Sequence, residues 1–394
     1  METPEKAISD AGFPVYLHGL SAIDSYLGRN ASAAVSVLCG ADLADLARLF
    51  DGLRYPGAAL ADAAVDWPGV SGGKTWYFRC EDPEDPRSCR SSFGFLDFFQ
   101  DCKTRRFYDP CGMYPLLRSV LKGVKHDMPA QWWKTVNADA DPLRALFDGA
   151  IILARYFPET GSREIGAAAA NLNSAGRAPP GEDQRLLLIR LLDSANPAAG
   201  FELLKRCGFI TAYWPELAAL DNVDHSKEFH PEGNVWKHTM ETMRYRKTPG
   251  QAGFDLRLSL GLLLHDVGKP LSEASGRRRF NGHAELGEPL ARRFLERLGF
   301  EAPLVRDVCY LVRNHMLPAA LSRLPLKRTG EIMESFLFPT LLELYRCDES
   351  SSFKGLDNYY QNSAAYQSYL KHRRNPYRSA NGKKLVCLSP SALP

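Results

Sequence analysis

The chain has 394 residues, of which 45% are hydrophobic and 24% are charged, and its formal net charge is +3. A chain of this length and composition is globular and has room for two or three domains. No apolar run approaches the ~20 residues of a membrane span, and the opening residues METPEKAISD lack the apolar core of a secretory signal. The nine cysteines are unclustered and form no C-x-x-C pair, so we expect reduced thiols in a cytoplasmic protein.

Residues 13–123 predict a mixed α/β fold. Short runs rich in small and β-branched residues alternate here with apolar-periodic stretches. We expect strands at Phe13–Leu17, Ala33–Leu38, Thr75–Arg79 and Phe93–Phe99, and helices at Leu20–Leu27 and Ala41–Leu53. The loop CEDPEDPRSC between the last two strands contains two Asp-Pro pairs, which break regular structure.

From residue 130 onward the pattern is helical. The segment Asp141–Tyr156 opens with Asp-Pro, a capping residue followed by one suited to a first helical turn. Further apolar-periodic runs follow, and a second block of helices begins after residue 220. The expected helices are Asp141–Tyr156, Gln184–Leu192, Gly200–Cys207, Trp236–Arg246, Leu256–His265, Gly287–Leu298, Ala302–Asn314 and Gly330–Arg346.

Histidines crowd into the second helical block. Of the nine in the chain, those within Asp224–Met316 are His225, His230, His238, His265, His283 and His315. The apolar run LSLGLLLHDVGKP places His265 and Asp266 side by side. Imidazole and carboxylate are the usual ligands of divalent transition metals. We therefore take this cluster as the candidate functional centre, with His225 and His230 as loop residues outside it.

The order of these residues resembles the ligand order of the HD phosphohydrolase superfamily. The matching residues are His238, His265, Asp266, His283, His315 and Asp348. The resemblance implies a site for one or two divalent ions. Its minimal ligand set would be His238, His265, Asp266 and Asp348. The remaining two histidines would either complete a second metal site or meet the substrate phosphate.

Hydrolysis of a phosphate ester accounts for these residue types. Mixed nitrogen and oxygen ligands hold a divalent ion and leave positions open for a phosphate oxygen and for a water whose pKa the ion lowers. We assign catalytic roles to Asp266, which binds one ion and orients the water or bridges two ions, and to Lys269, which neutralises phosphate charge. Arg277–Arg279 add positive charge before His283. Manganese, nickel, cobalt, iron, magnesium and zinc all suit such ligands.

A wider resemblance covers about Phe13–Asp348. The segments Pro215-Glu-Leu-Ala-Ala-Leu and His230-Pro-Glu-Gly-Asn-Val-Trp-Lys-His-Thr are similar to the bacterial tRNA nucleotidyltransferase / poly(A) polymerase family (class II), in its branch with a C-terminal HD domain. Ala140-Asp-Pro-Leu-Arg144 and Asn196-Pro-Ala-Ala-Gly-Phe-Glu-Leu-Leu resemble its Glu-Asp-x-x-Arg motif and its neck. The resemblance implies an α+β fold. It comprises a small nucleotidyltransferase-like α/β head (residues 1–125), a mainly α-helical neck (126–222), an all-α HD domain (223–352) and a basic tail (353–394).

The head departs from the family at the positions that hold its metal ions. The family's Gly-Gly-x-x-Arg-Asp turn corresponds to Gly19-Leu-Ser-Ala-Ile-Asp24, which keeps the first glycine and the aspartate. Where the family has Asp-x-Asp, Ala33–Leu38 offers no carboxylate, and where it has a third acid, Arg90, Ser91 and Ser92 offer none. Because nucleotidyl transfer needs ions held by such carboxylates, we infer that the head has lost its reaction.

Nucleotide binding by the head and neck stays open. Gly19 keeps the turn that cradles a triphosphate in the family, and Asp141 and Arg144 match the family's pair that reads the incoming base edge. Alternatively, Asp141 only caps a helix.

The residues from Ser352 onward are strongly basic. They are Lys354, Lys371, Arg373, Arg374, Arg378, Lys383 and Lys384, against a single acid, Asp357. Such a tail either lies on nucleic acid or forms a solvated, poorly ordered end, and we favour the second.

Three functions compete. The first is a metal-dependent HD phosphohydrolase acting on phosphate esters of nucleotides or RNA ends. The second is a working tRNA nucleotidyltransferase or poly(A) polymerase, which would require two of the nearby acids to converge beside Gly19; the candidates are Asp24, Asp42, Asp45 and Asp97. The third is a non-catalytic RNA- or nucleotide-binding protein. The expected partners are a nucleotide or a tRNA-like RNA and no membrane, and the sequence leaves the oligomeric state open.

Overall fold

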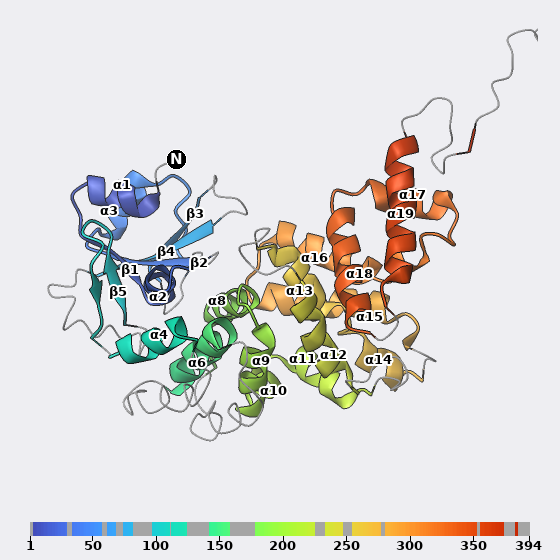
Figure 1. Ribbon diagram of the computed structural model, residues 1–394, viewed down its shortest axis with the longest axis horizontal. Coiled ribbons are helices and arrows are strands. Elements are labelled where there is room, and N and C mark those ends of the chain that lie inside the picture. Colours follow the sequence, from blue (N-terminus) through green and yellow to red (C-terminus); the bar gives the residue numbers. More distant parts are fainter. Residues whose placement is uncertain are drawn as a thin grey trace, which may run out of the picture. The chain divides into compact units, whose positions relative to one another are not determined.

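The computed structural model describes residues 3–29, 34–56, 61–67, 74–81, 97–110, 112–123, 142–157, 178–224, 233–246, 254–276, 280–352, 355–373 and 383–384. The chain divides into two compact units (Figure 1). The N-terminal unit comprises Met1–Ala218, Lys247–Leu256 and Arg297–Phe300, and the C-terminal unit comprises Ala219–Arg246, Arg257–Glu296 and Glu301–Pro394. Within the described ranges, no helix is both long and apolar enough to cross a membrane.

A six-stranded sheet with strand order β3-β4-β2-β1-β5-β6 forms the framework of the N-terminal unit. The strands are β1 (Val15–His18), β2 (Ala34–Cys39), β3 (Ala63–Trp67), β4 (Lys74–Cys80), β5 (Phe99–Asp101) and β6 (Phe107–Tyr108). β2 and β4 are parallel, and the other neighbouring strands pair antiparallel. The parallel pair is interior to the sheet, which is why β2 is a nearly continuous apolar run.

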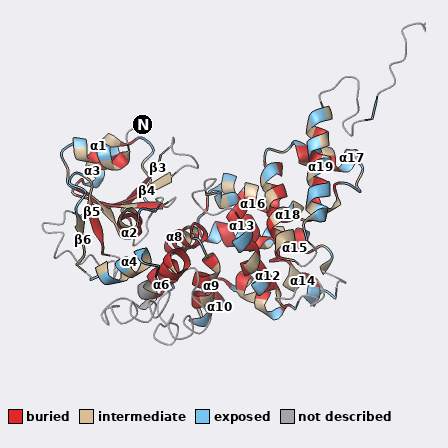
Figure 2. Ribbon diagram, in the orientation of Figure 1, coloured by how far each residue is buried: buried red, intermediate tan, exposed pale blue. Residues whose placement is uncertain are grey.

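Helices cover the sheet and continue beyond it. They are α1 (Pro4–Asp10), α2 (Leu20–Tyr26), α3 (Leu43–Leu49), α4 (Tyr114–Leu121), α6 (Pro142–Tyr156), α8 (Gly181–Leu192), α9 (Pro197–Arg206), α10 (Phe209–Tyr213) and α11 (Pro215–Ala218). Ile8 of α1 and Leu46 of α3 pack with Phe78 in one hydrophobic cluster, and Leu186 of α8 packs with Tyr77 in another. Much of α8 is buried (red in Figure 2). Phe78 and Tyr77 are successive residues of β4, so their side chains lie on opposite faces of the sheet.

The predicted elements of this unit are largely confirmed. The strands expected at Phe13–Leu17, Ala33–Leu38 and Thr75–Arg79 correspond to β1, β2 and β4. The strand expected at Phe93–Phe99 is wrong in position, because β5 begins at Phe99, while residues 93–96 lie outside the described ranges. β3 was not predicted. The helix expected at Ala41–Leu53 is shorter, since Asp42 caps its first turn and Phe50 is already extended.

A buried ion pair fastens α2 to α6. Asp24 is fully buried, and its carboxylate accepts hydrogen bonds from the Arg155 guanidinium, with Nη2 2.6 Å from Oδ2. The hydroxyl of Tyr156 donates a further hydrogen bond to Asp24 Oδ1 at 2.7 Å. Burial lowers the pKa of Arg155, but the charge and hydrogen bond of Asp24, with the charges of Tyr156 and Asp193, together outweigh burial and raise it. The turn aspartate therefore has a structural role.

The C-terminal unit is entirely helical in its described part apart from an isolated bridge. Its helices are η2 (Ala219–Asn222), α12 (Val235–Thr242), η3 (Met243–Tyr245), α13 (Leu256–Leu264), α14 (Lys269–Ala274), α15 (His283–Arg297), α16 (Ala302–Asn314), η5 (Pro318–Ala320), α17 (Leu326–Glu334), α18 (Phe338–Ser350) and α19 (Asp357–His372). The sequence of α13, LRLSLGLLL, is buried from Leu258 to its end, as expected of a helix that is apolar on every side. The α+β fold class is confirmed.

One helix expected from the sequence is divided into two separate helices in the structure. The sequence predicted a continuous helix over Gly330–Arg346, but α17 ends at Glu334 and α18 begins at Phe338. Ser335 adopts an extended backbone, and Pro339 occupies the first turn of α18. A proline is tolerated in a first turn and disrupts a helix interior, which explains the break.

The tail begins with a packed helix. The region after residue 352 was expected to be a solvated, poorly ordered end, but α19 fills much of it (red in Figure 1). Asn362 accepts a hydrogen bond from the backbone N–H of Ser322, and the Tyr369 hydroxyl donates one to Glu334. Tyr366 is buried as well. The prediction failed because it rested on the number of basic residues, whereas the buried tyrosines of α19 pack the helix against the rest of the unit.

We expect Asp24→Asn to destabilise the N-terminal unit by about 3–5 kcal/mol, because it leaves a buried guanidinium without its partner. Urea unfolding followed by circular dichroism measures the change. The matched control is Glu202→Gln, which removes the more exposed pair with Arg206 and should cost less than about 1 kcal/mol. Equal effects of the two substitutions would contradict the structural role of Asp24.

Candidate metal centre

The candidate ligands come from five different helical segments and are brought together in the C-terminal unit. His238 lies in α12, whose first turn is capped by the Asn234 side chain. His265 and Asp266 directly follow α13, His283 begins α15, and His315 directly follows α16. Asp348 lies near the end of α18. Placement at helix ends lets separate helices direct these side chains to a single point.

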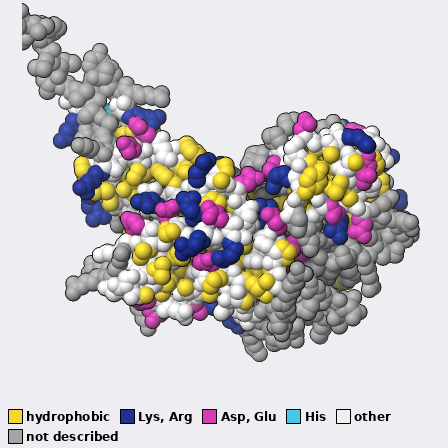
Figure 3. Space-filling view, turned by 180° about the vertical axis from the view of Figure 1, so that it is seen from behind, with side chains coloured by type: hydrophobic (Ala, Val, Ile, Leu, Met, Phe, Trp, Pro, Cys, Tyr) yellow, Lys and Arg dark blue, Asp and Glu magenta, His cyan; other side chains and the backbone are white. Residues whose placement is uncertain are grey.

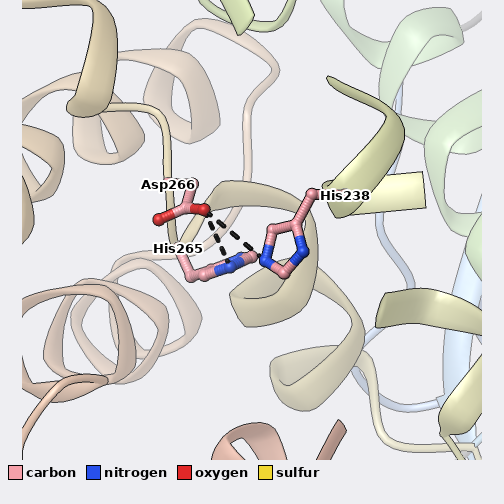
Figure 4. A group of neighbouring side chains, drawn as sticks. All are labelled: His238, His265 and Asp266. Carbon is pink, nitrogen blue, oxygen red and sulfur yellow. Dashed lines mark ion pairs between the residues drawn. The ribbon is translucent and has the colours of Figure 1, made fainter. Parts of the chain in front are cut away.

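Asp266 stands at the middle of the cluster. Its Oδ2 lies 3.2 Å from Nε2 of His265 and 3.8 Å from Nε2 of His238 (Figure 4). Its Oδ1 lies 3.4 Å from Nε2 of His283 and 3.9 Å from Nε2 of His315. Each oxygen thus faces a different pair of histidines. In both groups of three, the potential ligand atoms lie within 4.8 Å of one another.

Asp348 extends the first group. Its Oδ1 lies 3.0 Å from Nε2 of His238. The Asp348 side chain is 25% exposed, whereas those of His238 and Asp266 are at most 2% exposed. Asp348 therefore marks the side on which solvent reaches the centre.

Backbone carbonyls fix the tautomers of three imidazoles. Nδ1 of His265, His283 and His315 each lies 2.7–2.9 Å from the carbonyl oxygen three residues earlier. A carbonyl only accepts, so each Nδ1 carries a proton, and Nε2 is the ring nitrogen left to face the centre. This is the tautomer that a metal-ligating histidine adopts when its other nitrogen is held by a hydrogen bond.

Two of these ring nitrogens face each other. Nε2 of His283 lies 3.0 Å from Nε2 of His315. Because each Nδ1 already carries a proton, this contact is favourable only when a further proton or another cation lies between the two nitrogens. Nε2 of His265 is also buried and finds no hydrogen-bond partner of acceptable geometry among the described residues. The arrangement fits a divalent ion.

Electrostatics set the protonation states that metal binding needs. Burial raises the pKa of Asp266, but the charges of His265 and Lys269 outweigh it and hold that pKa well below its usual range. Burial, with the neighbouring His265 and His283, lowers the pKa of His315 to about 3. Burial raises the pKa of Asp348, but the hydrogen bond and charge of His238 and the charge of His265 together outweigh burial and lower it. Ionised carboxylates and neutral imidazoles are the forms that bind metal.

Lys269 is engaged with the centre itself. Its ammonium nitrogen lies 2.6 Å from Asp266 Oδ2 and 5.6 Å from the centre of the Phe280 ring. The sequence predicted this lysine as a neutraliser of phosphate charge. The structure places its charge first on the shared carboxylate, one helical turn away.

Two supporting residues escaped the sequence reading. Ser351 donates its hydroxyl proton to the Asp348 carbonyl at 2.7 Å, so its oxygen can accept from His238 Nδ1, 3.3 Å away. It thereby does for His238 what carbonyls do for the other histidines. Gly268 allows α15 to approach, since a Cβ there would lie 2.0 Å from the carbonyl oxygen of His283. Neither role has a sequence signal beyond proximity to a ligand.

Several predicted residues fall elsewhere. His225, His230, Arg277–Arg279 and Asp141 lie outside the described residues. Arg144 belongs to α6, but its side chain is not described. Gly19 caps α2 in the left-handed half of backbone space, with φ 57°, as the predicted turn requires. Its N–H bonds the carbonyl of Phe98.

The alternative acids of the head have structural partners. Asp24 pairs with Arg155, and Asp97 lies 3.2 Å from His18. Asp42 and Asp45 form the capping box of α3. Asp97 lies beside the Gly19 turn through its neighbour Phe98, and Asp24, in the helix that follows the turn, is held by Arg155. Two converging carboxylates are therefore not found there among the described residues.

The N-terminal unit contains a cavity of about 260 Å³. Its lining includes Val35 of β2, from the segment where the family would place its acids, and Lys74 and Trp76 of β4. Its one described carboxylate is Glu5, whose Oε2 accepts a hydrogen bond from Trp76 Nε1 at 2.8 Å. The described lining thus lacks a pair of carboxylates for metal ions.

Comparison with known proteins identifies a domain family and several related proteins. Residues 235–335 match the HD domain family. The chain therefore contains an HD domain, to which the histidine centre belongs. It is 34% identical over 248 residues to the CC-adding tRNA nucleotidyltransferase of Thermus thermophilus, covering 58% of this chain and 54% of that one. It is 33% identical over 262 residues to the A-adding tRNA nucleotidyltransferase of Deinococcus radiodurans, covering 63% and 56%.

This chain is thus a homologue of tRNA nucleotidyltransferases with an HD domain, and the predicted resemblance is confirmed. It spans about half the length of the curated relatives it matches. Among solved structures, a CCA-adding enzyme with ATP aligns over 93% of this chain and 81% of its own, with 13% identity and a TM-score of 0.40.

We expect Ser351→Ala to weaken divalent metal binding about 10- to 100-fold, because the His238 ring loses the partner that fixes its tautomer. Isothermal titration with Mn²⁺ on chelator-treated protein measures the affinity. The matched control is Ser350→Ala, one residue earlier, whose hydroxyl bonds the carbonyl of Arg346. Unchanged affinity in Ser351→Ala would show that the serine does not support the centre.

Metal-free protein should lose stability as pH falls from 6.5 towards 3, the window set by the ordinary and the lowered pKa of His315. Over that window the unfolded state takes up a proton that the folded state refuses, so acid favours unfolding. Below 3.8, protonation of Asp266 and Asp348 adds to the loss. Thermal melts at stepped pH measure this, and His315→Gln should flatten the slope above pH 4. An identical slope would contradict a buried neutral His315.

Proposed function

We propose that the C-terminal unit catalyses metal-dependent hydrolysis of phosphate esters of nucleotides or RNA ends. One observation carries the proposal: the two carboxylate oxygens of Asp266 face two separate histidine pairs inside an HD domain. The His283 and His315 ring nitrogens also face each other at 3.0 Å, a contact that a shared cation would satisfy.

The donor set names the residues that would hold the metal. His238, His265, Asp266 and Asp348 form one group. His283 and His315 either hold a second ion with Asp266 or meet the substrate phosphate. When bound, a divalent ion polarises a phosphoryl oxygen and lowers the pKa of water. Which of the divalent ions named above occupies the site depends on its affinity for these ligands and on its availability in the cell.

The protein's own residues prepare the centre for a phosphate. The carbonyls behind three imidazoles and the Ser351 hydroxyl keep the ring nitrogens aimed inward. Lys269 is 12% exposed, so its charge acts in a mostly dry environment, where attraction to an anion is stronger than in water. A substrate would approach past Asp348, the most exposed ligand.

The substrate class follows from the relatives. Those with significant identity are named for adding nucleotides to tRNA. A hydrolase attached to a head of that descent would meet RNA termini. 2′,3′-Cyclic phosphates, 2′-nucleotides and terminal phosphates are the esters found there, and we propose them as substrates.

We propose further that the head no longer transfers nucleotides. The cavity that contains Val35 lacks paired carboxylates in its described lining, and Asp24 is committed to Arg155. The identity to working nucleotidyltransferases favours the alternative that this reaction persists. Incubation with labelled CTP or ATP and tRNA lacking its terminal nucleotides separates the two, and incorporation would restore the alternative.

A third candidate is RNA binding without catalysis. On the face shown in Figure 3, Lys and Arg side chains lie interspersed with Asp and Glu. Arg292 and Arg313 of the C-terminal unit both reach Glu288. Paired cations of this kind contribute less to binding a polyanion than an unbroken basic surface does. This reading predicts RNA retention that a chelator leaves unchanged.

Hydrolysis of 2′,3′-cyclic AMP and of bis-p-nitrophenyl phosphate should require the centre. We expect the rate with Mn²⁺, Ni²⁺ or Co²⁺ to fall at least about 100-fold in His265→Ala and in Asp266→Asn, because each removes a ligand of the first group. A chelator should abolish the wild-type rate, and added metal should restore it.

The matched control is His372→Ala, a histidine at the end of α19 outside the cluster. It should keep the wild-type rate, and circular dichroism should show all variants folded. No hydrolysis by wild type with any of the common divalent ions would refute the proposal. So would full activity in Asp266→Asn.

A further inference from the structure

Two cysteines of the N-terminal unit lie side by side across the parallel strand pair. Cys39 ends β2, Cys80 ends β4, and the two are register partners. Neighbouring strands are about 4.7–4.9 Å apart, which falls within the Cα separation of about 4.4–6.8 Å that a disulfide spans. Residues paired in this way direct their side chains to the same face of the sheet. Forty residues separate the two cysteines along the chain and they form no C-x-x-C, so the sequence did not predict the pairing.

The two thiols are chemically unequal. Cys39 is fully buried in the hydrophobic cluster beneath α1 and α3, while Cys80 is only partly buried at its edge. Their side chains share a hydrogen bond, which raises the pKa of Cys39 together with burial and lowers the pKa of Cys80. Cys80 is thus the reachable thiol with thiolate character, and Cys39 is its protonated neighbour.

Other described cysteines differ from Cys80 in the direction of their pKa shift. Cys102 is also partly buried, yet burial raises its pKa to about 12. Burial likewise raises the pKa of Cys309 to about 11. A thiol held protonated is a poor nucleophile, because the thiolate is the reactive form. Cys102 therefore serves as an internal comparison of similar exposure.

We propose that Cys39 and Cys80 are a reversible redox site that forms an intramolecular disulfide with a peroxide as oxidant. The thiolate sulfur of Cys80 attacks one peroxide oxygen and the O–O bond breaks, which gives a sulfenic acid and hydroxide. Oxidation removes the thiolate charge of Cys80, which had raised the pKa of Cys39. The sulfur of Cys39 then attacks Sγ of Cys80 as its proton passes to the departing hydroxyl. The S–S bond forms, the S–O bond breaks, and the hydroxyl leaves with the thiol proton as water. The two thiols are oxidised by two electrons, and hydrogen peroxide is reduced to two waters.

The position of the pair gives the disulfide a structural consequence. β2 and β4 also supply Val35, Lys74 and Trp76 to the cavity described above, at the opposite ends of the same strands. A bond between Cys39 and Cys80 would prevent these two strands from separating. Because Cys80 is only partly buried, a dithiol can reach the disulfide and reduce it by thiol–disulfide exchange. These features describe a labile, reversible bond.

The test uses the full-length protein, first reduced and freed of reductant, then exposed to hydrogen peroxide at a small molar excess. Remaining thiols are blocked with iodoacetamide, and the protein is digested without reductant and analysed by mass spectrometry. We expect a peptide pair joined through Cys39 and Cys80 that dithiothreitol separates. The thermal transition of the N-terminal unit should rise on oxidation and return on reduction.

Variants assign the steps. Cys39→Ser should leave a sulfenic acid on Cys80 that dimedone traps, Cys80→Ser should leave Cys39 unmodified, and Cys102→Ser should cross-link as wild type does. Two wild-type results would overturn the proposal: alkylation of both thiols after peroxide, or over-oxidation of Cys80 without a cross-link. The wild-type result decides even if Cys39→Ser, a change in the core, does not fold.

Discussion

The negative charge of Asp266 is the constraint on which the C-terminal unit depends. A carboxylate with a 2% exposed side chain is stable there only if neighbouring groups compensate its charge. Lys269 supplies one full positive charge, and four imidazoles surround the two oxygens. Burial lowers the pKa of His315, so this imidazole does not compensate the carboxylate charge at neutral pH. The cluster therefore favours a cation, and a divalent ion would complete the compensation.

The same constraint explains how the helices are arranged. Each ligand sits at or near the end of a helix, where a turn of backbone leaves a carbonyl free to hold Nδ1 of His265, His283 or His315. Gly268 has no Cβ, so α15 can approach closely enough to bring His283 to Asp266. Positioning thus comes from the backbone, which is more rigid than a set of side chains. In the N-terminal unit the buried carboxylate of Asp24 is paired with the guanidinium of Arg155 instead.

The sequence predicted those features that depend on residues close together in the chain or on the order of particular residue types. The apolar period located most helices, and the order of histidines and aspartates identified the cluster. The break between α17 and α18 was missed because the apolar periodicity continues across it, although Pro339 indicates a new helix start. α19 was missed because its charges were counted and its aromatic face was not. The roles of Ser351 and of the Cys39–Cys80 pair depend on helix contacts and strand register, which the spacing along the chain does not encode.

The central claim is that Asp266 joins two metal-binding groups. Anomalous diffraction from crystals of the protein reconstituted with Mn²⁺, recorded at the manganese absorption edge, tests it most directly. The account predicts an anomalous peak within bonding distance of Asp266 and of the His238 and His265 ring nitrogens, and its loss in Asp266→Asn. Manganese bound only elsewhere, or a peak that persists unchanged without the carboxylate, would contradict it.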